Sequence, residues 1–103
     1  MPPPSGWIKV NVDAAFCNTT RIATLGVVAR NEKSEVGYSA VTKSADTDTP
    51  LLAEIKAILF GVQIAKEMNF LKIQLESDCL MAIRRYQRNK NPYVNGAAYC
   101  LIY

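Results

Sequence analysis

The pattern of apolar and polar residues predicts a three-stranded antiparallel meander in the first part of the chain. From Trp7 to Phe16 apolar residues occupy the even positions, and polar side chains occupy most of the odd ones. Such alternation is typical of a half-buried strand. The segment Ile22 to Arg30 is rich in β-forming residues, and a third strand is expected from about Glu35 to Thr42. Asn31 to Ser34 lies between these last two and is expected to form a hairpin loop.

The spacing of apolar residues then changes to a helical period. Pro50 stands at a favourable first helical position, and Asp48 or Thr49 precedes it as the expected cap. The helix is expected to continue to about Glu67, with Asn69 as its stop. The residues that recur at helical spacing are Leu51, Ile55, Ile58, Leu59, Val62 and Ala65.

After the helix the alternation of a strand returns. The apolar side of this fourth strand is formed by Leu71, Ile73, Leu75 and Ser77. A strand that re-enters a sheet through a helix is usually parallel to its neighbour, so we place it beside the first strand. A second helix is expected from about Cys79 to Arg88, capped by Ser77 or Asp78. Residues 91–103 carry no charge and fit either a fifth, edge strand or a tail without a partner.

Composition limits the chemistry that the chain can perform. The chain has 103 residues, which suits one domain with a modest core. Its net charge of +3 permits nucleic-acid binding without arguing for it. There is no histidine, and Cys17, Cys79 and Cys100 are widely spaced, which excludes the usual zinc sites and both Ser-His-Asp and Cys-His catalysis. Any chemistry must therefore depend on carboxylates.

The compartment is a separate expectation. The amino-terminal residues have no basic stretch or apolar core of a signal peptide, and no apolar run approaches membrane-spanning length. We therefore expect an intracellular protein, cytoplasmic or nuclear rather than secreted, with reduced thiols and no membrane partner. Nothing in the sequence identifies a protein partner.

Three acids, Asp13, Glu54 and Asp78, stand where the local pattern changes. Each also has a plain structural interpretation: Asp13 as a turn-forming residue at a strand end, Glu54 as an exposed helical glutamate, and Asp78 as a helix cap. However, the first strand continues past Asp13. In addition, the Glu54 side chain extends from the helix beside the stripe of apolar residues, and no basic residue follows it three or four positions later.

Taken together, the acids predict a metal site. Asp13 and Asp78 lie on the polar sides of two strands expected to be parallel neighbours, and Glu54 lies on the helix that joins those strands. Ligands of open α/β sheets bind near the carboxyl ends of such strands. Three gathered carboxylates repel one another unless a cation lies between them. Oxygen ligands without histidine or thiolate indicate Mg²⁺ or Mn²⁺.

In these features the chain resembles the ribonuclease H type-1 superfamily, and in particular its plant reverse-transcriptase-like domains. The resemblance covers about residues 5–88 of what we take as a single domain, 1–103. It lies in four segments whose order and spacing are more specific than any one of them: Trp7 to Ala15, Gly26 to Arg30, Ala53-Glu54, and Leu75 to Cys79.

The resemblance implies an α/β fold in which a mixed sheet, the meander plus a parallel fourth strand, carries packed helices. It also implies an endonuclease that cuts the RNA strand of an RNA–DNA hybrid with two divalent ions. Asp13, Glu54 and Asp78 would be catalytic metal ligands. The four basic residues of the second helix and its end would contact phosphates, or would be an ordinary solvated helix face: Arg84, Arg85, Arg88 and Lys90.

The chain departs from the family at its carboxyl-terminal end. The family continues into a fifth strand and a last helix that supplies a fourth acid, whereas no acidic residue follows Asp78 here. We therefore expect a fold that is incomplete at the carboxyl terminus. Two interpretations of the uncharged tail stay open: it partly covers the sheet, or it is the product of a truncated gene model or a decaying mobile element. Such a site would bind one ion well and the second poorly, with weak activity or none. Two alternatives stay open: a non-catalytic nucleic-acid-binding or protein-interaction module, and a small α+β domain whose acids are only caps and surface charges.

Overall fold

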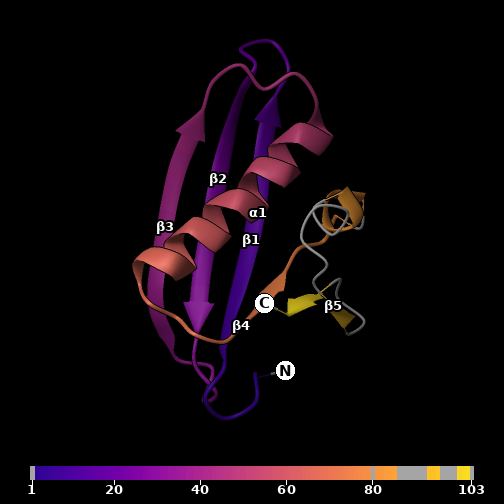
Figure 1. Cartoon of the computed structure of the whole chain (residues 1–103). Helices are drawn as coiled ribbons and strands as arrows, with labels where there is room; N and C mark the ends of the chain where they lie inside the picture. Colours follow the sequence, from indigo (N-terminus) through magenta and orange to yellow (C-terminus); the bar gives the residue numbers. More distant parts are fainter. Residues whose placement is uncertain (1, 80, 86–92, 96–99, 103) are drawn as a thin grey trace.

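The computed structural model describes residues 2–79, 81–85, 93–95 and 100–102. The described strands form one six-stranded sheet in the order β3-β2-β1-β4-β6-β5, and helix α1 lies across one face of it (Figure 1). The elements are β1 (Ile8–Cys17), β2 (Ile22–Arg30), β3 (Val36–Ser44), α1 (Pro50–Glu67), β4 (Ile73–Glu76), β5 (Tyr93–Asn95) and β6 (Cys100–Ile102).

The first three strands form the predicted antiparallel meander. β1 pairs with β2, and β2 pairs with β3, both antiparallel. The predicted loop between β2 and β3 is closed by Asn31, whose side-chain oxygen accepts hydrogen bonds from the backbone N–H groups of Lys33 and Glu35 at 2.9 and 3.0 Å. Ser34 takes a left-handed conformation there, with φ of 63°. β1 and β3 each run one or two residues past their predicted ends, because pairing with β2 continues to Cys17 and Ser44.

Helix α1 begins where its capping residues predict. The N-cap is Thr49, whose hydroxyl oxygen accepts a hydrogen bond from the N–H of Leu52 at 3.0 Å. Pro50 follows as the first helical residue, where its missing N–H removes no helical hydrogen bond. Of the two predicted caps, the structure therefore selects Thr49.

The carboxyl end of α1 is closed by a left-handed residue, as predicted. Asn69 has φ of 58°, a conformation that asparagine tolerates better than most residues. The N–H of Phe70 donates to the carbonyl of Ala65 at 2.9 Å, and the N–H of Asn69 donates to that of Lys66 at 3.1 Å. This pair of bonds is a Schellman motif, which satisfies carbonyls that the helix itself leaves without partners.

The core lies between α1 and the sheet. Buried apolar residues on β1, β2 and β4 alternate with less buried ones, so they all face the helix: Val10, Val12, Ala23, Leu25, Val27, Ala29, Ile73 and Leu75. Gly61 marks the closest approach of α1 to the strands. A Cβ atom there would lie 2.5 Å from Cγ1 of Val12 and 3.3 Å from Cδ1 of Leu75. Only glycine fits this crossing without rearrangement.

β4 lies beside β1 and parallel to it, which confirms the predicted mixed sheet and its crossover through α1. The strand is shorter than predicted, because the chain bends at residues 71–72 and leaves Leu71 92% exposed. Residues 81–85 are helical, within the predicted second helix, and Ala82 and Ile83 are buried in the core. The rest of that prediction from residue 86 onward lies outside the described residues.

The segment for which the sequence left two alternatives contains edge strands. β6 pairs antiparallel with β4, with Leu101 opposite Leu75, and β5 pairs with β6 outside it. The described part of residues 91–103 therefore extends the sheet.

Candidate active site

The candidate site lies where β1 extends beyond the end of its neighbour β4. Pairing of β1 with β4 ends at Asn11, opposite Glu76, whereas pairing with β2 continues to Cys17. The N–H of Ile8 donates to the carbonyl of Lys72, ahead of β4, at 3.0 Å. Because backbone groups on one edge of a strand recur every second residue, the N–H of Ala14 points to this same edge, beyond the end of β4.

Asp13 and Ala14 form the centre of the site. Asp13 lies within β1, opposite Gly26 on β2, and its side chain is exposed. Its Oδ1 accepts a hydrogen bond from the N–H of Ala14 at 2.9 Å. The prediction that the strand continues past Asp13 is thus confirmed, and the carboxylate does not end a strand or form a turn.

Glu54 approaches this point from α1. It lies in the second turn of the helix, half-buried next to the fully buried Ala53 and Ala57. Burial raises the pKa of the Glu54 carboxyl, and the charges of Asp13 and then Asp78 raise that pKa further. The backbone N–H of Ala14 acts in the opposite direction and lowers the same pKa. Asp13 and Glu54 therefore approach one backbone N–H from two different elements.

Asp78 completes the group from the end of β4. The strand ends at Glu76, and Ser77 is buried with its hydroxyl oxygen accepting a hydrogen bond from the N–H of Cys79 at 3.1 Å. This turn leaves Asp78 exposed. Its charge acts on Glu54 but ranks below burial and Asp13 as a cause of the raised pKa.

The three acids share one region without forming a finished ligand shell. In the described part of the chain, no three His, Cys, Asp or Glu side chains lie close enough together to hold a metal ion. The donors are nevertheless carboxylate oxygens, and the charges of Asp13 and Asp78 add to burial in raising the pKa of Glu54. This chemistry fits a hard divalent cation, which would offset the repulsion. The metal role of Asp13, Glu54 and Asp78 stays a prediction.

Comparison with known proteins agrees with this topology. The sequence pattern of the reverse transcriptase-like family matches residues 11–101, most of the chain and all three acids. The chain belongs to this family of ribonuclease H-like domains. No curated protein and no solved structure matches it significantly. The match runs past residue 88, where the sequence resemblance ended, and includes β5 and the first residues of β6.

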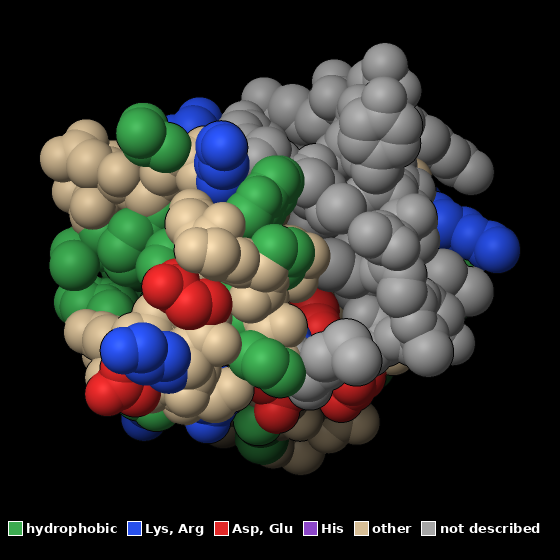
Figure 2. Space-filling model, turned by 90° about the horizontal axis from the view of Figure 1, so that it is seen from below, with side chains coloured by type: hydrophobic (Ala, Val, Ile, Leu, Met, Phe, Trp, Pro, Cys, Tyr) green, Lys and Arg blue, Asp and Glu red, His purple; other side chains and the backbone are tan. Residues whose placement is uncertain are grey.

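The family is one that commonly uses divalent metals, and its fold suggests nucleic-acid binding. In the reverse transcriptase-like domain, Arg84 and Arg85 lie exposed in the helical residues 81–85. Arg88 and Lys90 lie outside the described residues, so the predicted phosphate-binding role of the four is not tested. Figure 2 shows the end of the molecule away from the carboxyl end of β1, and there the described Lys and Arg side chains are spread out rather than gathered in one basic patch. None of the described helices is both long and apolar enough to cross a membrane.

Sequence reasoning missed two features that support the site. Gly61 carried a usable signal, because a glycine inside a helical apolar stripe usually has a packing reason. The second feature is Lys56, which binds the loop between β3 and α1 and is described below. No local pattern points to it, because its partners are ordinary Ser and Thr hydroxyls and one backbone carbonyl.

Proposed function

We propose that this domain binds RNA–DNA hybrids and cleaves their RNA strand slowly, using a divalent cation held by Asp13, Glu54 and Asp78. One observation carries the proposal: at the open edge of β1, the charges of Asp13 on β1 and of Asp78 after β4 add to burial in raising the pKa of Glu54 on α1. Membership of a ribonuclease H-like family supports the choice of substrate.

The residues of the chain have distinct tasks in this proposal. The N–H of Ala14 holds the Asp13 carboxylate toward the open edge. Glu54 has a raised pKa, so it retains a proton to a higher pH than an ordinary glutamate and must release it to act as a ligand. Asp78 is exposed and is the more adjustable third ligand.

The cation would supply the chemistry that carboxylates alone lack. When bound, Mg²⁺ lowers the pKa of a water molecule that attacks phosphorus and stabilises charge on the phosphate oxygens. Exposed Arg84 and Arg85 are proposed to contact the phosphates of the hybrid, and 2′-hydroxyl contacts across the minor groove would select the RNA strand.

A second candidate is a nucleic-acid-binding module without catalysis. One observation favours it: in the part of the chain that the structure describes, the acids do not form a three-ligand group. Both candidates predict binding of the hybrid, and only the first predicts cleavage.

The test uses a labelled RNA–DNA hybrid with the full chain, in Mg²⁺ and in EDTA. We expect slow cleavage of the RNA strand that needs Mg²⁺ and falls about a hundredfold or more in Asp13→Asn, since loss of several kcal/mol of transition-state stabilisation has that effect. Glu35→Gln is the control, because this carboxylate lies in the distant turn between β2 and β3, and its cleavage rate should equal that of wild type.

Cleavage that is equal in Asp13→Asn and wild type would remove these acids from the mechanism. Binding without any cleavage would select the second candidate. Absence of both binding and cleavage would contradict the two together.

A further inference from the structure

Lys56 holds the loop between β3 and α1 through three hydrogen bonds. Its ammonium group donates to the hydroxyl of Ser44 at 2.9 Å, to the carbonyl of Ala45 at 3.0 Å and to the hydroxyl of Thr47 at 3.0 Å. An ammonium group has three N–H donors, so these bonds satisfy all of them. All three acceptors are uncharged oxygens, one on the last residue of β3 and two in the loop that follows it.

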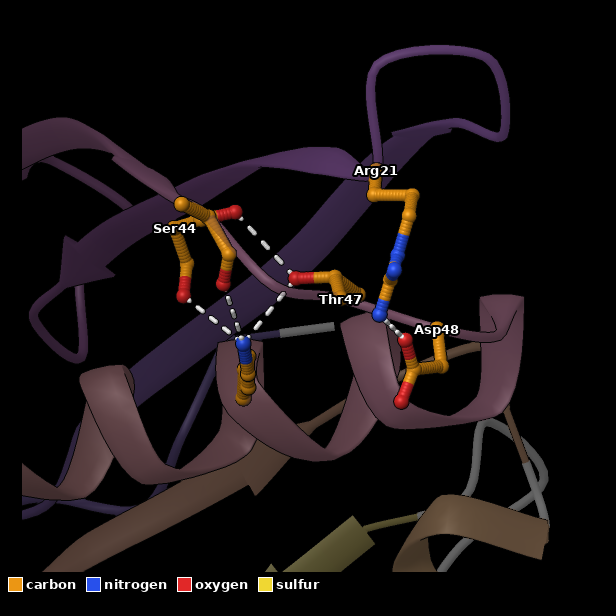
Figure 3. Close-up of polar contacts among 6 residues, drawn as sticks. Arg21, Ser44, Thr47 and Asp48 are labelled. Carbon is orange, nitrogen blue, oxygen red and sulfur yellow. Dashed lines mark hydrogen bonds and ion pairs between the residues drawn. The ribbon is translucent and has the colours of Figure 1, made fainter.

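The loop is in turn attached to the hairpin that contains β1. Thr47 is fully buried, and its N–H donates to the carbonyl of Arg21 in the turn between β1 and β2 at 2.9 Å. Its hydroxyl donates to the carbonyl of Ser44 at 3.1 Å. Figure 3 shows Thr47 pointing toward Ser44, while Arg21 and Asp48 form an ion pair beside them.

These contacts connect two elements of the candidate site. A continuous path runs from the β1–β2 turn through Thr47 to Lys56, and Lys56 lies two residues after Glu54 on α1. The path therefore fixes the first turns of α1 relative to β1, the strand that carries Asp13. The Arg21–Asp48 pair is exposed on both sides and contributes little to this attachment.

The geometry of these bonds is specific. The ammonium group is half-buried, and three acceptors from one short stretch of chain converge on it. Three convergent bonds specify one position for this group relative to the loop. A compact ammonium group suits three acceptors around a point, whereas the flat guanidinium of arginine does not.

We propose that Lys56 is the positioning residue of the carboxylate site: by tying the 44–47 loop to α1, it sets where Glu54 lies relative to Asp13 and Ala14. This inference rests on the proposed function only for its effect on metal binding. Its effect on the placement of Glu54 is independent of metal.

The experiment compares Lys56→Met with Lys66→Met in the full chain. Both variants remove one positive charge from α1 and keep a good helix former, but Lys66 is exposed in the last turn. Two quantities are measured: the affinity for Mn²⁺ by electron paramagnetic resonance, and the nuclear Overhauser effect between the Glu54 side chain and the Ala14 amide. We expect Lys56→Met to weaken Mn²⁺ binding at least fivefold and to reduce the Overhauser effect by at least half. We expect Lys66→Met to change Mn²⁺ affinity less than twofold.

A second pair of variants covers the case in which Lys56→Met does not fold. Thr47→Ser keeps the hydroxyl that accepts the bond from Lys56, and Thr47→Val removes it while keeping the shape. Only Thr47→Val should show the losses expected for Lys56→Met, a difference that a general packing role would not produce.

The outcomes separate the two proposals. If wild type binds no Mn²⁺, the metal proposal fails, and the Overhauser effect alone decides the role of Lys56. If the Overhauser effect is unchanged in Lys56→Met and in Thr47→Val, Lys56 does not position Glu54, whatever the metal affinity of wild type.

Discussion

Strand β1 has one edge that is paired from Lys9 to Cys17 and one that is paired only from Ile8 to Asn11. Nine residue pairs join it to β2, whereas four join it to β4. The paired edge supports the fold, and the open edge leaves backbone groups and Asp13 available at the carboxyl end of β4. The site therefore arises because two parallel neighbours have unequal lengths, and three acids lie around the resulting step.

The largest expected effect comes from placing proline on either edge. In Ala15→Pro the lost N–H faces β2 and belongs to the antiparallel ladder. We expect its free energy of unfolding to fall by about 2–4 kcal/mol, because a ladder hydrogen bond is lost and the carbonyl that accepted it on β2 is left without its donor. In Ala14→Pro the lost N–H faces the open edge, so the loss should be clearly smaller. Urea unfolding measures both.

The same pair of variants also tests the site. Ala14→Pro removes an N–H group that has two effects in wild type. This group donates a hydrogen bond to Asp13, and it lowers the pKa of Glu54. We expect a weaker affinity for Mn²⁺ in a folded protein. Equal loss of stability in Ala14→Pro and Ala15→Pro would show that the two edges do not differ as described.

Packing beneath the site gives the next effect. Gly61→Ala places a Cβ atom 2.5 Å from Cγ1 of Val12, next to Asp13, and the β-branched side chain of Val12 has little freedom to move away. Overpacking of this kind costs about 1–3 kcal/mol, against a gain of up to about 1 kcal/mol in helix propensity. We expect a net loss of stability in urea unfolding, with Gly37→Ala as a control at a position where nothing lies within 4 Å. A Gly61→Ala variant as stable as wild type would contradict the close crossing.

Removing a charge from the site should stabilise the fold. Burial, Asp13 and Asp78 raise the pKa of Glu54 in the folded state, so the folded protein holds this proton more tightly than the unfolded chain does. The corresponding stability is present at pH values below the ordinary pKa of glutamate and is lost as pH rises through the raised pKa.

Glu54→Gln should therefore be more stable than wild type at neutral pH without metal, and the difference should shrink as pH falls toward 4. Thermal unfolding between pH 4 and pH 8 measures it, with Glu67→Gln as an exposed control on the same helix. A constant difference at all pH values would contradict a repulsion among the acids.

The smallest effect concerns Cys17, the last residue of β1. Hydrogen bonds from the Thr19 side chain first, then from Thr20 and from the backbone of both, lower the pKa of the exposed Cys17 thiol to about 6. Its reaction with iodoacetamide should be half-maximal near pH 6, and Thr19→Ala should move this midpoint upward. A midpoint near the ordinary thiol value of about 8.5 would contradict these bonds.

Local signals explain what the sequence predicted well. The limits of α1 follow from Thr49, Pro50 and Asn69, each of which acts within one turn of the helix. The mixed sheet follows from strand alternation and from the rule for helical crossovers. This topology brings Asp13, Glu54 and Asp78 into one region. Asp13 lies on β1, Asp78 follows the parallel strand β4, and Glu54 lies on the helix that joins the two strands.

What the sequence did not predict depends on contacts between distant segments. The role of the Ala14 N–H could not be predicted, because it depends on β4 pairing with β1 only as far as Asn11. The sequence alternation predicted a longer β4 than the structure contains. Lys56 has no local signal, because its partners meet it only after the 44–47 loop folds back onto α1. Leu71 fits the apolar alternation of the fourth strand, yet the bend at residues 71–72 leaves its side chain exposed.

The account is tested most directly by Mn²⁺-induced broadening of backbone amide signals in the full chain. We predict that low Mn²⁺ concentrations broaden Ala14 and the residues next to Glu54 and Asp78 first, while Lys33 and Ser34 at the other end of the meander stay sharp. Asp13→Asn should require a much higher Mn²⁺ concentration for the same broadening. Broadening that is absent at Ala14, or equal at both ends of β1, would contradict a cation site at the open edge.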